Sequence, residues 1–589
     1  MASLSTPMPL ALPSATTTTT AGGGASFGPF CRNKKVPSST IHKTNKLVIT
    51  CSGSNGNANG EKSNNSLWPG KFIDRREALI GLGGLYGTAS STFGADPFAL
   101  ADPVETPDPA KCHVIKNLTK DIKELNCCPP STDNVKPFLK LRVRKAAQSL
   151  DKEYIEKYKE AVALMRALPD DDPRSFKQQA DVHCAYCNGG YNQLGFSVEL
   201  QVHFSWLFFP FHRYYLYFHE RILGSLIKDP DFALPFWNYD APEGMEIPKI
   251  FTDESSSLYD AFRDGLHQPP TLVVLDYNKI DPDVPRQTQI DNNLTIMHRQ
   301  VVSGATTPLL FFGQPYRSGK QPNPGMGTVE NIPHTPIHVW TGDRNQSSGI
   351  DMGAFFSAAR DPIFYAHHAN VDRFWTIWKT LGGKRRDIKD TDFLNASFIF
   401  YDENCEAVRV YVKDCLDTRA LGYVYDDTVK IPWLETPPTP RVPRKTKKLK
   451  KKSVGQMGKL PSVLDKIVRF EVKRPKKSRS KKEKEDEEEI LVIDGIEFDG
   501  NKCIKFDVFI NDEDDTEIRA NNSEFAGSFV NLPHAKGSSM KINTSLRLGI
   551  SKVLEDLNAD DDDNIIVTLV PRFGDEPPII QDIRIEYDA

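Results

Sequence analysis

The sequence lacks features that would assign it at once to a membrane or a nucleic acid. It has no uninterrupted apolar run of the roughly 20 residues that a membrane-spanning helix needs. Its 74 Lys and Arg residues nearly balance its 78 Asp and Glu residues, and the formal net charge is -4. Bulk charge therefore indicates no polyanionic partner. We expect a protein that does not bind nucleic acid and is not stably inserted into a membrane.

Cysteine is scarce, and one common zinc motif is absent. Ten cysteines in 589 residues are too few for a disulfide scaffold. Cys112, Cys127 and Cys128 nevertheless lie just ahead of Cys184 and Cys187, which predicts local bridges in an oxidising compartment. The chain contains no His-Glu-x-x-His sequence, and this argues against a hydrolytic zinc site of that type.

Acidic residues are missing from positions 1–50, which are rich in Ser and Thr and carry a few Lys and Arg. This composition is typical of an organelle transit peptide, with a disordered tail as the alternative. The next segment, 51–101, favours the transit peptide because it carries a second targeting pattern.

That second pattern is a twin-arginine export signal. Arg75 and Arg76 precede the short apolar run ALIGLGGLYGTA, and Ala99-Leu100-Ala101 follows as a small-x-small cleavage site. Two targeting signals in series predict import into a chloroplast and then transfer to the thylakoid lumen by the twin-arginine machinery. We expect the mature chain to begin near Asp102.

Changes in composition divide the remaining chain into three parts. Residues 102–434 combine helical periodicity with long connections, which predicts a mainly α domain, a helical bundle with short strands and long loops. Residues 435–488 are dense in Pro and charge and predict an exposed linker that a protease can reach. Residues 489–589 hold short alternating strings that predict an all-β domain of sandwich or jelly-roll type.

Local signals place three helices in the α domain. Asp172-Pro173 and Asp361-Pro362 each pair an N-cap residue with proline at the first helical position, which predicts helix starts. The first of these two helices contains His183. An earlier helix, ending before Pro169, is predicted by apolar residues spaced three and four apart, namely Tyr154, Ile155, Tyr158, Val162 and Met165.

The stretch 181–220 places His183, His203 and His212 among aromatic residues typical of a buried core. On one helix His203 and His212 would point about 180° apart, at roughly 100° per residue. They can face one metal if Pro210 begins the helix, with His212 in its first turn and His203 in the extended segment before it. The sulfur of Cys187 could then lock the ring of the histidine on the loop.

A second histidine group is simpler. His334 and His338 are spaced i, i+4, so on a helix both rings project from one face and can share a metal. The third ligand must come from His367 or His368, on the helix that Asp361 starts. Two all-imidazole groups, without thiolate or carboxylate, suit copper, zinc or iron.

Zinc is the less specific interpretation of these two histidine groups. Two sites built only from imidazoles fit a pair of copper ions that cycles between Cu(I) and Cu(II), with dioxygen as co-substrate. Asp372, four residues after His368, could orient a ring or pair with Arg373. The other histidines are expected to be surface or hydrogen-bonded polar residues, namely His42, His113, His219, His267, His298 and His534.

Four motifs resemble a known family: HCAYC, VHFSWLFFPFHRYYLYFHERILG, ENIPHTPIHVWTG and DPIFYAHHANVDRFW. They resemble the plant polyphenol oxidases, the catechol oxidases and tyrosinases of the type-3 copper class. Lys505-Phe506-Asp507-Val508 resembles the KFDV motif of their C-terminal domain. The resemblance implies oxidation of o-diphenols (catechols) by dioxygen to o-quinones and water, and a latent proenzyme whose C-terminal domain covers the copper site until a protease cuts the linker.

The resemblance also implies roles for individual residues. One copper would be held by His183, His203 and His212, and the other by His334, His338 and His368. A thioether would join Cys187 to His203, and disulfides would join Cys112 to Cys128 and Cys127 to Cys184.

Further residues match positions around the family's pocket. Phe355 matches the gate residue over the copper site, and Glu330 matches the acidic residue that holds a water. Thr335 stands where some relatives have an Asn that helps Glu330, so we favour oxidation of diphenols over hydroxylation of monophenols. Phe393 replaces a Trp of the relatives' DWL motif, a change within an aromatic packing position.

Two alternatives use the same six histidines. A reversible dioxygen carrier of the hemocyanin type would bind oxygen yet consume little catechol, and plastid targeting argues against it. A specialised biosynthetic phenol oxidase, of the aurone-synthase kind, differs only in its phenolic substrate.

Overall fold

The computed structural model describes residues 111–116, 118–119, 122–128, 141–346, 349–439, 457–511, 520–534, 539–574 and 576–588. The transit peptide and the twin-arginine segment expected at 1–101 lie outside these residues. None of the described helices has the length and apolar character needed to cross a membrane.

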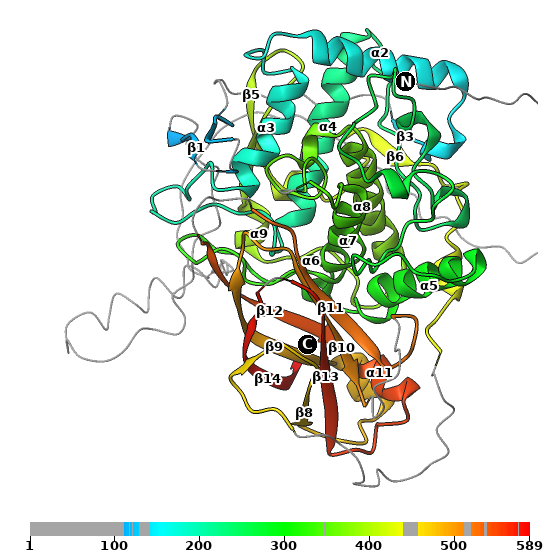
Figure 1. Ribbon diagram of the computed structural model, residues 1–589, viewed down its shortest axis with the longest axis vertical. Helices are drawn as coiled ribbons and strands as arrows, with labels where there is room; N and C mark the ends of the chain where they lie inside the picture. The colour runs from blue at the N-terminus through cyan, green and yellow to red at the C-terminus, as the bar shows by residue number, and fades with distance from the viewer. Residues whose placement is uncertain are drawn as a thin grey trace, which may run out of the picture. The chain divides into compact units, whose positions relative to one another are not determined.

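Residues 141–439 form a largely helical part, as the periodicity predicts (Figure 1). Its helices are α2 (Lys152–Ala167), α3 (Phe176–Cys187), α4 (Phe208–Leu226), α5 (Arg286–Met297), α6 (Pro308–Phe312), α7 (Thr335–Thr341), α8 (Ile363–Thr380) and α9 (Thr391–Asn395). Short strand pairs join distant segments: β3 (Arg142–Arg144) runs parallel to β6 (Tyr423–Tyr425), and β4 (Ser397–Tyr401) runs antiparallel to β5 (Ala407–Tyr411). Ahead of them, β1 (Ile115–Lys116) pairs with β2 (Glu124–Leu125).

The C-terminal part consists of two four-stranded antiparallel sheets, with strand orders β11-β10-β13-β8 and β12-β9-β14-β7. Apolar side chains of both sheets join one buried core, so the all-β prediction is confirmed as a sandwich. Its elements are β7 (Ser462–Val463), β8 (Val468–Lys473), α10 (Lys481–Asp486), β9 (Glu488–Asp499), β10 (Ile504–Ile510), β11 (Phe525–Asn531), β12 (Lys541–Gly549), α11 (Ser551–Asp556), β13 (Asn564–Phe573) and β14 (Ile579–Asp588).

The sandwich begins earlier than the expected boundary at 489. Strands β7 and β8 and helix α10 all lie inside the predicted linker 435–488, so that linker is too long. In β8 the buried Phe470 and Val472 alternate with outward-facing charged residues, so the charged sequence between two basic runs conceals the strand. Arg474 then pairs with buried Glu489 at 2.8 Å.

Two predicted helix starts need correction. Ser175, and not Asp172, caps α3, because its hydroxyl accepts a hydrogen bond from the amide of Gln178. Asp172 instead binds the side chain of Arg174 at 2.7 Å. Helix α4 begins at Phe208, two residues before Pro210, which lies within its first turn where the missing N–H costs nothing.

Helices α4 and α8 are held together by buried charges. Asp372 on α8 accepts hydrogen bonds from Arg213 of α4 at 2.5 Å and from the hydroxyls of Tyr423 and Tyr425, each at 2.6 Å. The positive charges of Arg213 and Arg144 hold the pKa of Asp372 below its usual range, against the effect of burial. The expectation that Asp372 orients a histidine or pairs with its sequence neighbour is therefore wrong.

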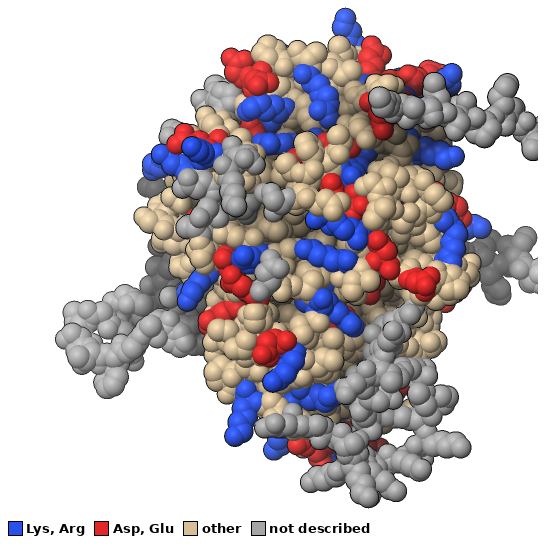
Figure 2. All heavy atoms as spheres, in the orientation of Figure 1, with Lys and Arg blue, Asp and Glu red and all other residues tan. Residues whose placement is uncertain are grey.

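Charges of both signs are interspersed on the surface. Figure 2 shows Lys and Arg beside Asp and Glu over one face, without a broad region of a single sign among the described residues. This distribution agrees with the near-neutral charge of the whole chain.

Candidate metal centre and its surroundings

The first histidine group comes from three different pieces of chain. His183 lies on α3, His203 lies in the non-helical segment before α4, and His212 lies near the start of α4. All three rings are buried, and their candidate ligand atoms lie within 4.8 Å of one another. The structure thus brings together the three histidines that the sequence singled out, with His203 on a loop as expected.

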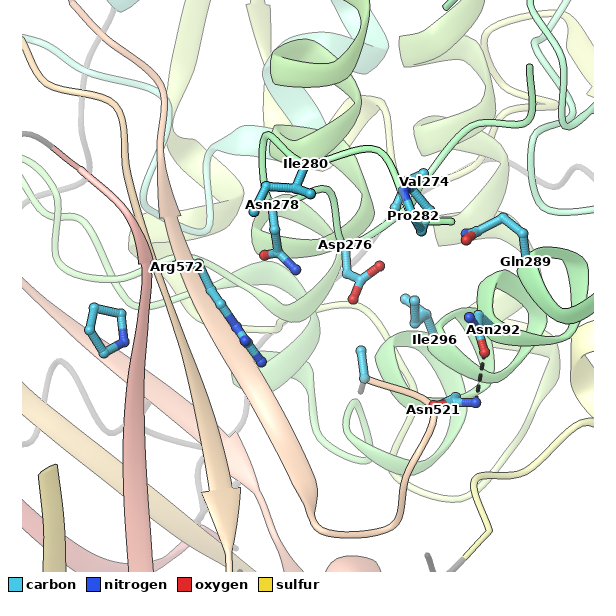
Figure 3. A pocket seen from close by; sticks show the side chains of 12 residues that line it. Val274, Asp276, Asn278, Ile280, Pro282, Gln289, Asn292, Ile296, Asn521 and Arg572 are labelled. Atoms are coloured by element: carbon cyan, nitrogen blue, oxygen red, sulfur yellow. Dashed lines mark hydrogen bonds between the residues drawn. The ribbon is translucent and has the colours of Figure 1, made fainter. Parts of the chain in front are cut away.

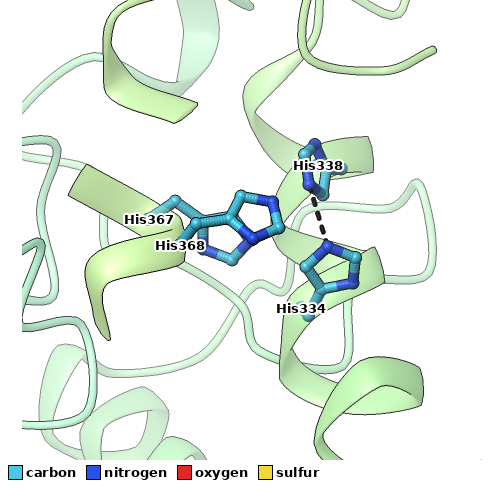
Figure 4. Close-up of side chains that lie close together, drawn as sticks. All are labelled: His334, His338, His367 and His368. Atoms are coloured by element: carbon cyan, nitrogen blue, oxygen red, sulfur yellow. Dashed lines mark hydrogen bonds between the residues drawn. The ribbon is translucent and has the colours of Figure 1, made fainter. Parts of the chain in front are cut away.

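The second group contains four buried histidines, His334, His338, His367 and His368 (Figure 4). His334 ends a helical turn, Glu330–His334, that is kinked at Ile332, and α7 carries His338 one turn later. Both of these rings point toward the adjacent pair on α8 (Figure 4). The i, i+4 spacing therefore places His334 and His338 on one face, as predicted.

Backbone carbonyls fix the orientation of the rings. The Nδ1 atoms of His183, His212 and His338 lie 2.9, 2.8 and 2.9 Å from the carbonyl oxygens of Phe355, Phe208 and Met352. Each Nδ1 donates there, so each Nε2 keeps an unprotonated lone pair directed away from the carbonyl. Among the described residues, the Nε2 atoms of His183 and His212 have no hydrogen-bond partner.

The geometry at His334 and His338 suits a shared cation. Their Nε2 atoms face each other at 3.2 Å, while the Nδ1 of His334 lies 3.2 Å from the Glu330 carbonyl. With one Nε2 protonated this contact is a hydrogen bond, and with both rings donating through Nδ1 the two lone pairs converge as two ligands of one cation do. Burial lowers the pKa of His338 to about 4 and that of His212 to about 3, so the imidazoles are neutral near pH 7 and available as ligands.

The two groups lie directly beside each other. The ring of His212 stacks on the ring of His368, with centroids 4.1 Å apart and planes inclined by 13°. His203 and His334 face each other at 6.0 Å. The residues present thus fit two adjacent metal ions with nitrogen ligands, and imidazole is a donor suited to copper.

Glu330 lies next to these histidines without being one of the ligands the sequence predicts. Its Oε1 accepts a hydrogen bond from the amide of Phe204 at 2.7 Å, while its Oε2 is buried without a hydrogen-bond partner among the described residues. Burial raises the pKa of the Glu330 carboxyl well above its usual value. The hydroxyl of Thr335 donates to the backbone carbonyl of Glu330 at 2.8 Å.

Phe355 links the site to the β-sandwich. Its ring lies 4.5 Å from the ring of His203 and 4.7 Å from that of His534. Its backbone N–H donates to the carbonyl of Pro533 at 3.2 Å. The loop after β11 therefore lies against the residue that the resemblance assigns as the gate.

His534 was missed by sequence reasoning, which expected an ordinary polar residue. It is completely buried, and its Nε2 accepts a hydrogen bond from Gln201, a residue 333 positions earlier in the chain. Gln201 in turn accepts from the amide of His203 at 3.0 Å. No local pattern could reveal this contact, because it exists only once the two domains are docked.

Disulfides join Cys112 to Cys128 and Cys127 to Cys184, the two pairs that the resemblance implies. The second ties α3 to the N-terminal arm. Cys187 is a buried thiol whose pKa is raised by burial, and its carbonyl accepts a hydrogen bond from Gln201 at 2.9 Å.

The helical fold and the paired histidine groups define a protein with a tyrosinase-type centre. Residues 173–381 match the common central domain of tyrosinase, residues 387–439 the polyphenol oxidase middle domain, and residues 460–587 the chloroplastic polyphenol oxidase C-terminal domain. The chain belongs to the plant polyphenol oxidase family.

Individual relatives agree with this assignment. Chloroplastic polyphenol oxidase of Malus domestica is 51% identical, over 89% of this chain and 90% of that protein. Aureusidin synthase of Antirrhinum majus is 54% identical, over 86% and 92%. The solved structure of latent apple tyrosinase is similar with a TM-score of 0.74 and 55% identity, over 78% of this chain and 100% of that one.

Proposed function

We propose that this chain oxidises catechols to o-quinones, reducing dioxygen to water at two copper ions. His183, His203 and His212 would hold one ion, and His334, His338 and His368 the other. The observation that carries the proposal is the pair of Nε2 atoms of His334 and His338 facing each other at 3.2 Å beside a second all-imidazole group. When bound, the copper pair supplies the electrons that dioxygen takes up and recovers them from the catechol.

The protein's own groups prepare the site for this chemistry. The carbonyls of Phe355, Phe208 and Met352 hold three imidazoles in the tautomer that leaves Nε2 free. The aromatic walls exclude bulk water, and the ring of Phe355 stands over His203, where a flat phenolic ring could stack. Two catechols give two quinones for each dioxygen, and their four protons leave with the two waters formed.

We expect diphenols to be better substrates than monophenols. The Thr335 hydroxyl is engaged by the backbone carbonyl of Glu330, so it is not free to help the Glu330 carboxylate activate a water. The similarity to aureusidin synthase favours a second candidate, a biosynthetic phenol oxidase with the same centre. The enzyme names of the relatives argue against a reversible dioxygen carrier.

The decisive experiment measures bound metals together with dioxygen uptake on a panel of 4-methylcatechol, tyrosine and larger phenols. We expect two copper ions per chain and rapid uptake with 4-methylcatechol. A zinc-loaded protein, or a single copper per chain, would reject the proposal. Tyrosine hydroxylation without a catechol primer would overturn only the preference for diphenols.

We further propose a thioether between Cys187 and His203. Joining Sγ to a ring carbon breaks one S–H and one C–H bond and releases two protons and two electrons, which dioxygen accepts as hydrogen peroxide. The bond would restrain a ligand that no helix holds, without changing its Nε2. A tryptic digest of the copper-loaded chain should contain the linked peptides with two hydrogens fewer than their summed mass, and separate unmodified peptides would disprove the bond.

The relatives also bear on the targeting of this chain. Several relatives are named chloroplastic, which supports plastid import. We propose that the twin-arginine segment at 51–101 then directs the chain to the thylakoid lumen, and that residues 102–434 form the catalytic part. Import into isolated plastids followed by fractionation tests this, and recovery in the stroma would contradict it.

A further inference from the structure

A cavity of about 380 Å³ lies between the helical part and the β-sandwich (Figure 3). None of the histidines of the two groups lines it. One wall comes from residues 274–296, and the opposite wall includes Asn521, Pro571 and Arg572. This volume is within the range of small-molecule sites. None of its lining residues takes part in the proposed oxidation.

The carboxylate of Asp276 points into this cavity (Figure 3). It forms no hydrogen bond or ion pair with any other residue that the structure describes, whereas its backbone carbonyl accepts from the Lys505 ammonium at 2.8 Å. Burial raises the pKa of Asp276, and Lys505 opposes that shift. The carboxylate accepts a hydrogen bond from its own backbone N–H, and its remaining acceptor sites are open to a bound molecule that offers hydroxyl donors.

Side-chain amides around Asp276 offer both donors and acceptors. Asn292 accepts a hydrogen bond from Asn521 across the domain boundary at 2.7 Å (Figure 3), which leaves its own NH2 group for a ligand. Gln289 donates to Asn293 at 2.9 Å and keeps its carbonyl oxygen. Asn278 accepts from Lys505 and keeps its NH2 group. Such a mixture suits hydroxyl groups, which donate and accept.

The ionisable groups around the cavity balance. The Asp507 carboxylate accepts a hydrogen bond from the Arg572 guanidinium at 2.5 Å and lies 3.1 Å from the Lys505 ammonium. The two ionisable residues that line the cavity itself, Asp276 and Arg572, carry opposite charges. A charged ligand would add an uncompensated charge to a partly buried site, so a neutral ligand is favoured.

We infer that this cavity binds a neutral, polyhydroxylated molecule the size of a monosaccharide, such as the sugar of a glycoside. Its hydroxyls would donate to Asp276 and exchange hydrogen bonds with the amides of Asn278 and Asn292. Its C–H groups would contact the aliphatic surfaces of Val274 and Ile296.

Such a ligand would also strengthen domain docking. Its walls come from both domains, so the molecule binds fully only when the sandwich is docked, and it stabilises that arrangement by mass action. This consequence rests on the proposed oxidation and on shielding by the sandwich. Binding itself does not depend on either.

Isothermal titration calorimetry on the full copper-loaded chain tests the inference with methyl glucoside, methyl galactoside and methyl mannoside. We expect saturable binding of at least one of them, and weaker binding of cationic glucosamine and anionic gluconate. Asp276→Ala should weaken binding about tenfold or more, since it removes a charge-assisted hydrogen bond. Asp283→Ala, an exposed aspartate of the same loop, is the matched control and should change affinity less than about twofold.

Asn521→Ala provides a second probe from the other domain and should also weaken binding, with circular dichroism verifying the fold. No saturable heat with any neutral sugar up to about 10 mM, ten times a Kd of about 1 mM, would overturn the site. Equal affinity in the Asp276 variant and the wild type would overturn it as well. Sugar binding without any fall in catechol oxidation by the uncut chain would overturn the effect on docking, and absence of oxidation altogether would instead reject the proposed function.

Discussion

Two adjacent imidazoles, His367 and His368, could occupy one ligand position. His368 stacks on His212 and lies 4.9 Å from His334, so it touches both histidine groups. His367 stacks on His334 at 5.3 Å and also packs against Tyr239, with ring centroids 5.6 Å apart. We therefore predict that His368→Gln loses one of the two copper ions and lowers catechol oxidation by about 100-fold or more, whereas His367→Gln retains both ions.

Copper per chain, measured by atomic absorption on folded variants, decides between the two. His267→Gln is a matched control, because His267 is also fully buried but is held by Asp281 and by the carbonyl of Trp340. It should keep both ions. Equal copper loss in the His367 and His368 variants would mean that both rings contribute.

How far sequence reasoning succeeds at this scale depends on whether a contact is local. The i, i+4 spacing of His334 and His338 predicts their common face because a helix fixes it. The partner of Asp372 could not be predicted, since its side chain leaves α8 toward Arg213 on α4 and not along its own helix. His534 is still less predictable, because it reaches the site only through domain docking.

Among the elements, α4 carries His212 of the first group and α8 carries His367 and His368 of the second, and the buried cluster around Asp372 fixes the spacing of these two helices. Asp372→Asn removes the negative charge that neutralises Arg213 and Arg144, and all three of these side chains are buried away from solvent. We predict a loss of about 3–5 kcal/mol in the free energy of unfolding, the usual cost of breaking a buried ion pair from one side. Urea unfolding at pH 7, where Asp372 is ionised, measures it.

The exposed Asp427 serves as the comparison. Asp427→Asn should change the free energy of unfolding by less than about 0.5 kcal/mol. If the Asp372 variant were equally mild, the charges would not hold the helices together. A parallel loss of copper in the Asp372 variant would indicate that the helix spacing also sets the ligand geometry.

The boundaries of helices and strands are predicted less well than their existence. The helix α2 is predictable because its apolar spacing is regular and Ala167 precedes Pro169. The start of α3 is not, because Asp172 and Ser175 are both good caps and only the folded chain shows that Arg174 occupies the first. Strand β8 is not predicted and falls inside the expected linker, because the charged residues on its outer face outnumber its two buried side chains.

For the whole molecule, the sandwich is held on the catalytic part by polar contacts at both ends of the interface. Near the site, Pro533 accepts from Phe355 and His534 accepts from Gln201. Farther away, the buried ammonium of Lys505, in the KFDV motif, donates to the backbone carbonyl of Asp276. These contacts are noncovalent, so the linker's role is to keep the local concentration of the sandwich high.

A cut between Thr439 and β7, within residues 440–456, tests whether the sandwich shields the site. We expect cleavage there to raise kcat/KM for 4-methylcatechol by about tenfold or more. A preference of about 1.4 kcal/mol for the docked state already covers the active site in about nine molecules of ten, and release of the sandwich would open all of them. The gain should grow as the cut protein is diluted, since two fragments then reassociate more slowly than a tethered domain docks. The cut can be made at a protease site engineered into residues 440–456, and the same engineered chain left uncut is the control for that change of sequence. Mass spectrometry verifies the cut, and an unchanged kcat/KM at every dilution would show that the sandwich does not shield the site.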